Sequence, residues 1–216
     1  MTTLPASAFL GGFALTFSLI VSLGAQNLFL LRQGLRREHV GAVVAFCILA
    51  DILLMAAGVA GIGRLLQAVP GLAAWLTLGG AAFLAWYGYG AAQRAWRGGA
   101  GAAAARAAGT PLAATLLQAA AITLLNPHVY LDTVLLVGVA GSALAAEARP
   151  LFLAGAGSAS LIWFAGLGYG ARLLAPLFAR PGAWRVLDGA VAAVMLLLAI
   201  GLLASLRGSL GIGQQP

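Results

Sequence analysis

Long apolar runs that carry almost no charge fill this chain and constrain its fold more than any other feature. About 20 consecutive apolar residues suffice for one helix to cross a bilayer. We predict spans at residues 9–31, 40–63, 72–93, 111–139, 150–171 and 186–206. These spans leave no room for a soluble domain, so the sequence predicts an all-α membrane protein with six transmembrane helices.

The composition agrees with this fold class. The chain of 216 residues is 62% hydrophobic and 8% charged, whereas soluble domains carry about 25% charged residues. A net charge of +7 in a soluble protein would suggest nucleic acid, but the arginines here fall between the spans. We therefore expect no nucleic-acid partner and a lipid bilayer around the chain. Cys47 is the only cysteine, which excludes an internal disulfide.

The arginines are unequally divided between the two sides of the predicted membrane. The first, third and fifth connectors hold Arg32, Arg36, Arg37, Arg94, Arg97, Arg106, Arg172, Arg180 and Arg185. The opposite side holds Arg64, Arg149 and Arg207. Because basic connectors stay in the cytoplasm, we expect both termini outside and the long linker 94–110 in the cytoplasm.

That linker divides the chain into two three-span halves, residues 1–93 and 111–216. An odd number of spans per half gives the halves opposite orientations, so the fold class predicted is two inverted three-helix repeats. Sliding the second span by about 107 positions puts Asp51 on Ser158, and sliding the first by about 102 puts "GAQN" (24–27) on "NPHV" (126–129).

The overlaid stretches are polar interruptions of apolar spans. "ITLLNPHVYLDTVLLV" (122–137) contains Asn126, Pro127, His128 and Asp132. Proline removes a helical hydrogen bond, and non-helical backbone at membrane depth survives only when protein buries it or a water-filled cavity meets it. The pattern is compatible with a simple kink, but interrupted spans at corresponding places of two halves indicate a transporter binding site.

Asp51 lies near the middle of the second span, where an acid costs roughly 2.5–3.5 kcal/mol. One interpretation is a protonated aspartate that is hydrogen-bonded to Asn, Gln or Ser across a helix interface. The other is a carboxyl that binds a proton in one state and a cationic substrate in another. His128 is open to roles as gate, proton relay or packing residue, and Trp163 to cation–π contact or packing. For Asp188, an interfacial contact with Arg185 is the simplest interpretation.

The sequence resembles the lysine/arginine exporter family of LysE type over nearly its whole length. The resemblance rests on "GAQNLFLLRQGLRREH" (24–39), "ADILLMAAGVAGIG" (50–63), "LNPHVYLDT" (125–133) and "SASLIWFAGLGYGARLLAP" (158–176). It implies six helices and export of basic L-amino acids from the bacterial cytoplasm. Matched by motif, the substrate-binding candidates are Gln26, Asn27, Asp51, Asn126, Pro127, His128 and Asp132. Further candidates for the cavity lining are Gly24, Tyr130, Ser158 and Trp163.

These observations predict a secondary active exporter of arginine or lysine in the bacterial inner membrane, with alternating access. Moving one positive charge outward costs about 2.3 kcal/mol per 100 mV of inside-negative potential, so we expect protons as the coupling ion, by antiport. We expect neither a cofactor nor a metal, and the small-residue helix faces are compatible with a homodimer.

Three alternatives stay open at this point. The nearest is an exporter of neutral amino acids or inorganic cations on the same fold, although a metal would need several clustered Cys, His or carboxylate ligands. A different class is an intramembrane enzyme that uses His128 and Asp132, for which the sequence has no HExxH-type motif. A membrane scaffold would not need intramembrane acids.

Overall fold

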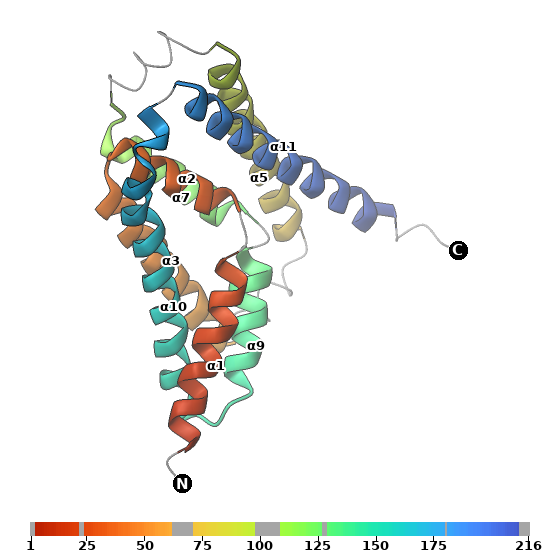
Figure 1. The fold of residues 1–216 in the computed structure, drawn as a ribbon. Coiled ribbons are helices and arrows are strands. Elements are labelled where there is room, and N and C mark those ends of the chain that lie inside the picture. Colours follow the sequence, from red (N-terminus) through yellow and green to blue (C-terminus); the bar gives the residue numbers. More distant parts are fainter. Residues whose placement is uncertain are drawn as a thin grey trace.

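The protein is all-helical in the computed structural model, which describes residues 3–21, 24–61, 71–97, 109–126, 129–179 and 181–211. The described residues contain no strand. Four long helices are continuous (Figure 1): α3 (Val40–Val59), α5 (Leu72–Arg97), α10 (Arg149–Gly170) and α11 (Pro181–Gly211). Two short 3-10 helices, η2 (Ala171–Leu174) and η3 (Leu177–Ala179), connect α10 to α11.

The first and fourth predicted spans are each broken in the middle. The first consists of α1 (Thr3–Ile20) and α2 (Ala25–Arg36), which are bent by 81° relative to each other. The fourth consists of α7 (Leu112–Leu124), the π-helix η1 (Tyr130–Leu136) and α9 (Val137–Ser142). Both breaks occur where the polar interruptions predicted them, because glycine in one span and Asn-Pro in the other disfavour a continuous helix.

Fewer than six single helices meet the length and hydropathy expected of a membrane span. Among the described residues, three helices are long and apolar enough: Val40–Val59, Arg149–Leu174 and Gly182–Leu206. The bent pair of α1 and α2 makes a fourth if it is taken as one span. The structure thus supports a membrane protein with several apolar helices, and the six-span inverted repeat stays a prediction.

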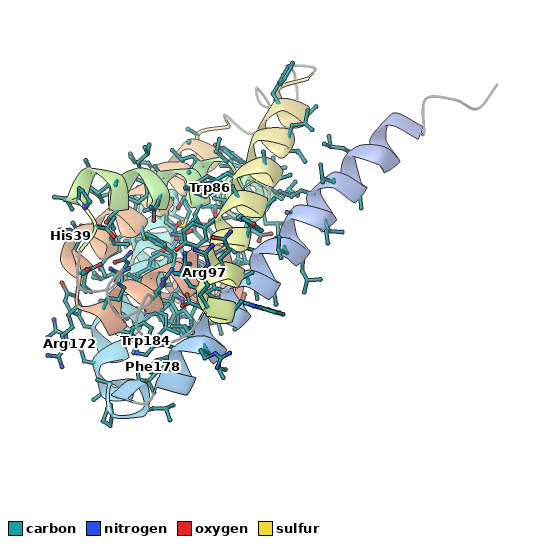
Figure 2. All side chains as sticks on the ribbon, turned by 90° about the horizontal axis from the view of Figure 1, so that it is seen from above. His39, Trp86, Arg97, Arg172, Phe178 and Trp184 are labelled. Carbon is teal, nitrogen blue, oxygen red and sulfur yellow. The ribbon has the colours of Figure 1, made fainter. Side chains whose placement is uncertain are left out.

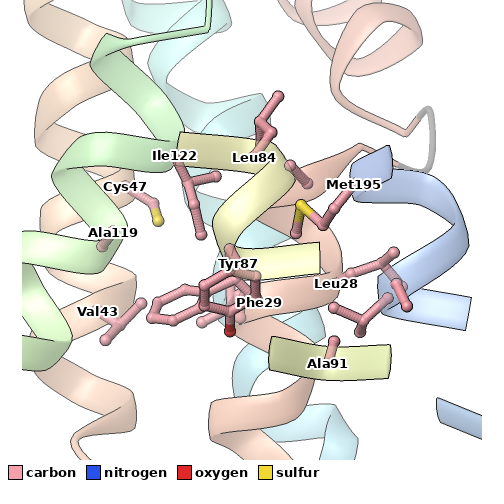
Figure 3. Close-up of a cluster of buried hydrophobic side chains, with 14 of the residues drawn as sticks. Leu28, Phe29, Val43, Cys47, Leu84, Tyr87, Ala91, Ala119, Ile122 and Met195 are labelled. Atoms are coloured by element: carbon pink, nitrogen blue, oxygen red, sulfur yellow. The ribbon is translucent and has the colours of Figure 1, made fainter. Parts of the chain in front are cut away.

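The helices form a bundle and a separate pair. α1, α3, α9 and α10 pack together, whereas α5 and α11 run antiparallel to each other and lean away from the bundle (Figure 1). The short helices α2 and α7 lie between the two groups. A buried cluster joins α2, α3, α5, α7 and α11 (Figure 3), and its labelled members include Phe29, Cys47, Leu84, Ile122 and Met195.

Close helix contacts hold the bundle together near the N-terminus of the chain. A Cβ added to Gly138 of α9 would lie 2.8 Å from the Cα of Gly58 in α3. On α10, a Cβ added to Gly155 would meet the backbone of Phe9 in α1. Small residues let helix backbones approach in a membrane, and these contacts bring α1 against α10 and α3 against α9 at this end of the bundle.

Arg149 begins α10 at the end near the N-terminus, whereas the opposite end of the molecule carries most of the arginines of the described residues. α2, α5 and α10 end there, and α3 and α11 begin there (Figure 1). Figure 2 looks onto this end, where His39, Arg97 and Arg172 are labelled on three different helix termini or connectors. The basic residues on the described parts of the first, third and fifth connectors therefore gather at one end, called here the arginine-bearing end.

Candidate functional site

A cavity of about 290 Å³ lies where the ends of both broken spans meet. The end of α1 and the start of α2 form one side, and the residues around the second break form another. α3, α10 and α11 each contribute one residue. The lining consists of Leu19, Ile20, Gly24, Ala25, Gln26, Asn27, Asp51, Asn126, Val129, Asp132, Thr133, Phe164 and Leu198.

Asp51 reaches this cavity from α3 and is only 5% exposed. Its Oδ2 accepts a hydrogen bond of 2.9 Å from the hydroxyl of Ser160 on α10, which is fully buried. The contact is the serine bond across a helix interface that one interpretation of Asp51 foresaw. The same carboxyl also lines the cavity, as the other interpretation requires.

Ser160 is a site residue that the sequence alignment of the halves missed. Sliding the second span placed Ser158 over Asp51, but the Ser158 hydroxyl donates to the Ala154 carbonyl of its own helix over 2.7 Å. Residues two apart point to opposite sides of a helix, so only one of the two serines can face α3. Both lie in the stretch "SASLIWF", so the sequence pointed to the segment that contacts Asp51 but to a different serine within it.

Asn27 connects the two halves of the first span. Its Nδ2 donates to the carbonyl of Ile20, the last residue of α1, over 2.8 Å. Its Oδ1 accepts a 3.1 Å bond from Nε1 of Trp163 on α10. The Asn27 amide therefore holds the broken span in its bent shape while one edge of the residue lines the cavity.

Gln26 presents an amide with unused hydrogen-bonding capacity. It lines the cavity beside Asn27, and its buried Nε2 has no hydrogen-bond partner among the described residues. The thiol of Cys47 lies close to this side chain, but sulfur is only a weak acceptor. Gln26 is thus a donor that a ligand in the cavity could use.

The second break is connected in the same way as the first. The Tyr130 hydroxyl donates to the carbonyl of Leu124, the last residue of α7, over 2.8 Å. The π-helix that follows carries Asp132 and Thr133 into the cavity lining. π-helical turns occur mostly as local insertions in helices and often at functional sites.

The predicted site residues fall into three groups. Gly24, Gln26, Asn27, Asp51, Asn126 and Asp132 line the cavity. Tyr130, Ser158 and Trp163 are not among the lining residues and make the helix contacts described above. Pro127 and His128 lie outside the described residues. Within the described part of the chain, no three His, Cys, Asp or Glu side chains are grouped so as to hold a metal.

A second, larger cavity of about 470 Å³ lies at the arginine-bearing end. Asp188 of α11 borders it and forms ion pairs with two arginines through one oxygen, with Arg32 at 3.3 Å and with Arg94 at 3.2 Å. The predicted contact of Asp188 with Arg185 is wrong, since the Arg185 Nε donates to the Ala95 carbonyl. The helix pair α5 and α11 brings these charges together, which the linear sequence does not reveal.

Comparison with known proteins agrees with the resemblance in sequence. The family described as LysE type translocator matches residues 17–206. The arginine exporter protein ArgO of Yersinia enterocolitica is 46% identical over 200 residues, which cover 91% of this chain and 96% of that protein. Proteins of Mycobacterium bovis and Mycobacterium tuberculosis, provisionally named amino-acid transporters, are 44% identical over 188 residues, covering 87% of this chain and 92% of theirs. No solved structure matches the chain.

Proposed function

Since the chain belongs to the LysE type translocator family, we propose that it exports basic L-amino acids, arginine above all, across the bacterial cytoplasmic membrane. Family membership makes the protein a transporter, which sets aside the intramembrane enzyme built on His128 and Asp132. The sequence identity of 46% to an arginine exporter supports arginine as the substrate.

The cavity at the two helix breaks is the observation that carries this proposal. Asp51 and Asp132 line it, whereas no arginine does so among the described residues. Two carboxyl groups without a basic partner in the lining favour a positively charged ligand, because a nearby cation compensates the cost of an ionised acid in a membrane. The guanidinium or ammonium of the substrate side chain is that cation.

The α-amino-acid head group needs different partners. α2 begins at this cavity with Gly24 as its first flanking residue, and no described side chain caps that helix start. A helix N-terminus carries partial positive charge and suits a carboxylate, as in transporters whose broken helices point at anionic groups. The amide nitrogen of Gln26 adds a donor, and the carbonyl end of α1 at Ile20 suits the α-ammonium.

Proton antiport follows from the energetics of moving a cation outward. Export of one positive charge costs about 2.3 kcal/mol per 100 mV, so a coupled downhill ion is needed when internal substrate is low. A single buried carboxyl can bind a proton or the substrate cation but not both. Asp51 is the candidate for this exchange, since the Ser160 hydroxyl can donate to its ionised form.

Alternating access between two inverted repeats is supported by two features. In each broken span, a side chain beyond the break donates to the last carbonyl of the preceding helix, Asn27 to Ile20 and Tyr130 to Leu124. The two ends of the molecule also differ, because close glycine contacts and a cavity of about 240 Å³ lie at one end and the larger cavity of about 470 Å³ lies at the other. Such asymmetry is expected of one state in a rocking cycle.

The nearest alternatives are tested by competition in one assay. Reconstituted protein takes up labelled arginine, and excess unlabelled arginine, homoserine or a divalent metal is added. We expect arginine and lysine to compete and the other two to leave uptake unchanged; competition by homoserine or metal alone would favour the alternatives. Asp51→Asn should abolish uptake, whereas Glu147→Gln, which alters an exposed acid far from the cavity lining, should retain it.

A further inference from the structure

We propose that the larger cavity at the arginine-bearing end is an entry subsite that binds the α-carboxylate of an amino acid before it reaches the cavity at the helix breaks. This inference rests on the proposed function and adds a second binding site to it. The cavity has about 470 Å³, enough for an amino acid of the size of arginine.

The charge of the lining favours an anion. Arg32, Arg36 and Arg94 line the cavity, and Asp188 is the only acid among the described lining residues. Asp188 is shared between Arg32 and Arg94, while Arg36 pairs with Glu38 over 2.9 Å. Two acids thus face three guanidinium groups, which leaves one positive charge without a carboxylate.

Arg32 and Arg94 each have a buried N–H group without a hydrogen-bond acceptor among the described residues. A guanidinium has five N–H groups, and the structure joins each of Arg32 and Arg94 to Asp188 by one contact. Arg32 has a side chain that is 8% exposed, and its buried Nε is without a hydrogen-bond partner among the described residues, as is Nη2 of Arg94. Buried donors without partners are costly, and the planar guanidinium matches the two oxygens of a carboxylate.

Groups for the rest of an amino acid lie beside these arginines. Gln33 is 4% exposed, and its buried Oε1 has no partner within the described part of the chain. This oxygen can accept from an α-ammonium. The aromatic residues Trp86, Tyr87 and Tyr89 also line the cavity, and aromatic rings can contact a cationic side chain.

Helix α2 borders both cavities. Gly24, Gln26 and Asn27 at its start line the cavity at the helix breaks, whereas Arg32 and Arg36 near its end line the larger one. A substrate that enters from the arginine-bearing end therefore meets carboxylate-binding groups first and the acids Asp51 and Asp132 second. The groups that attract the substrate therefore differ between the two cavities. Because no single site binds all of its charges at once, the substrate is not held too tightly to be released.

Equilibrium binding of labelled arginine to the purified protein tests the subsite. We expect two sites per chain in the wild type and one in Arg94→Gln, with the remaining affinity unchanged. Arg97→Gln is the matched control, because Arg97 is one turn away on α5, exposed and outside the described lining. Agmatine, which is arginine without its carboxylate, should compete at one site only; equal competition at both sites overturns the proposal.

Asp188→Asn separates ligand binding from a merely structural role. Removing the acid frees both arginines for a carboxylate, so binding at the subsite should tighten by about tenfold, whereas Arg94→Gln abolishes it. If the ion cluster only joins α2 to α5 and α11, both variants lower thermal stability and neither changes the number of sites. Size-exclusion chromatography and thermal unfolding confirm that each variant is folded, and if Asp188→Asn is unfolded, the agmatine competition still decides.

The failure of this inference and that of the proposed function give different results. If Arg94→Gln keeps two sites while Asp51→Asn loses one, the subsite is refuted and export is untouched. If neither the wild type nor any variant binds arginine, both proposals fail. Titration with vesicles of phosphatidylglycerol distinguishes an anionic lipid head group as the ligand of the subsite: labelled arginine should stay bound at both sites in their presence, and its displacement from the subsite by these vesicles would contradict the proposal.

Discussion

Asp51 combines two properties that are hard to satisfy together. It is buried within the apolar part of α3 and hydrogen-bonded to Ser160, and it also borders the cavity at the helix breaks. The serine provides one donor to the carboxyl whether or not a substrate is present. In the proposed transport cycle, the substrate cation or a proton supplies the remaining partner, so that occupancy of the cavity is linked to the charge of this residue.

Removing the Ser160 hydroxyl tests that role. Hydrogen bonds to charged groups contribute about 1.5–3 kcal/mol, so Ser160→Ala should raise the KM for arginine by about tenfold or more while transport stays coupled to protons. Ser158→Ala is the control, because that hydroxyl bonds only within α10, and it should transport like the wild type. An unchanged KM in Ser160→Ala would show that the bond is unimportant to the cation-binding state.

The residues of the site were predictable to different degrees. Acids and amides stand out in apolar spans because they are costly there, and six of the predicted positions line the cavity. Asn27 was expected to hold substrate, yet its amide joins α1 to α2. Arg32, Arg94 and Asp188 come together across α2, α5 and α11, and only tertiary packing determines which arginine meets which acid.

At the scale of helices, the two breaks are the features that form the cavity of the candidate site. A helix that ends within a membrane leaves carbonyl groups that need hydrogen-bond donors. At each break, a side chain of the following segment provides such a donor. The Asn27 amide donates to the Ile20 carbonyl, and the Tyr130 hydroxyl donates to the Leu124 carbonyl. Sequence alone predicted that the spans are interrupted, but it did not predict the 81° bend between α1 and α2, which depends on this contact and on packing against α10.

Loss of these contacts should destabilise the protein. Asn27→Ala and Tyr130→Phe each remove a donor from a helix end, so we expect each to lower the free energy of unfolding by about 1–3 kcal/mol and to reduce arginine transport. Ser18→Ala removes a hydroxyl that donates only to Leu15 within α1, and it should have little effect. Thermal unfolding in detergent measures the difference, and equal midpoints for all three variants would contradict the role given to the breaks.

Close contact between α3 and α9 is a second element-level feature. A methyl group on Gly58 would meet the Val134 carbonyl and lie 3.0 Å from the Cα of Gly138. Gly58→Ala should therefore push the helices apart, destabilising the protein by about 1–3 kcal/mol and reducing transport. Gly166→Ala adds the same methyl group where the described residues leave open space, and it should retain wild-type stability and activity.

At the scale of the molecule, the arginine-bearing end defines an orientation. Basic connectors stay in the cytoplasm, so Arg97 should lie inside and Glu147 outside, with both termini outside. We expect a membrane-impermeant maleimide added to intact cells to label Glu147→Cys and not Arg97→Cys. The native Cys47 is buried and provides a low background. Labelling of Arg97→Cys alone would reverse the proposed orientation.

The overall architecture was predictable in its helices and not in their arrangement. Hydropathy identified every long helix, because crossing a bilayer demands a continuous apolar run. The leaning pair of α5 and α11 and the cluster around α2 and α7 (Figures 1 and 3) depend on side-chain packing between distant segments. Several helices also share nearly the same Ala, Gly and Leu composition, so the sequence says little about which helices pack against each other.

The most direct test of the central claim is the flux of labelled arginine in proteoliposomes under imposed pH gradients of each sign. A buried aspartate that exchanges a proton for the substrate cation predicts that arginine moves opposite to the proton gradient, that reversing the gradient reverses the flux, and that Asp51→Asn abolishes the gradient-driven component. Arginine flux that ignores the gradient, or that Asp51→Asn leaves fully coupled, would contradict the account.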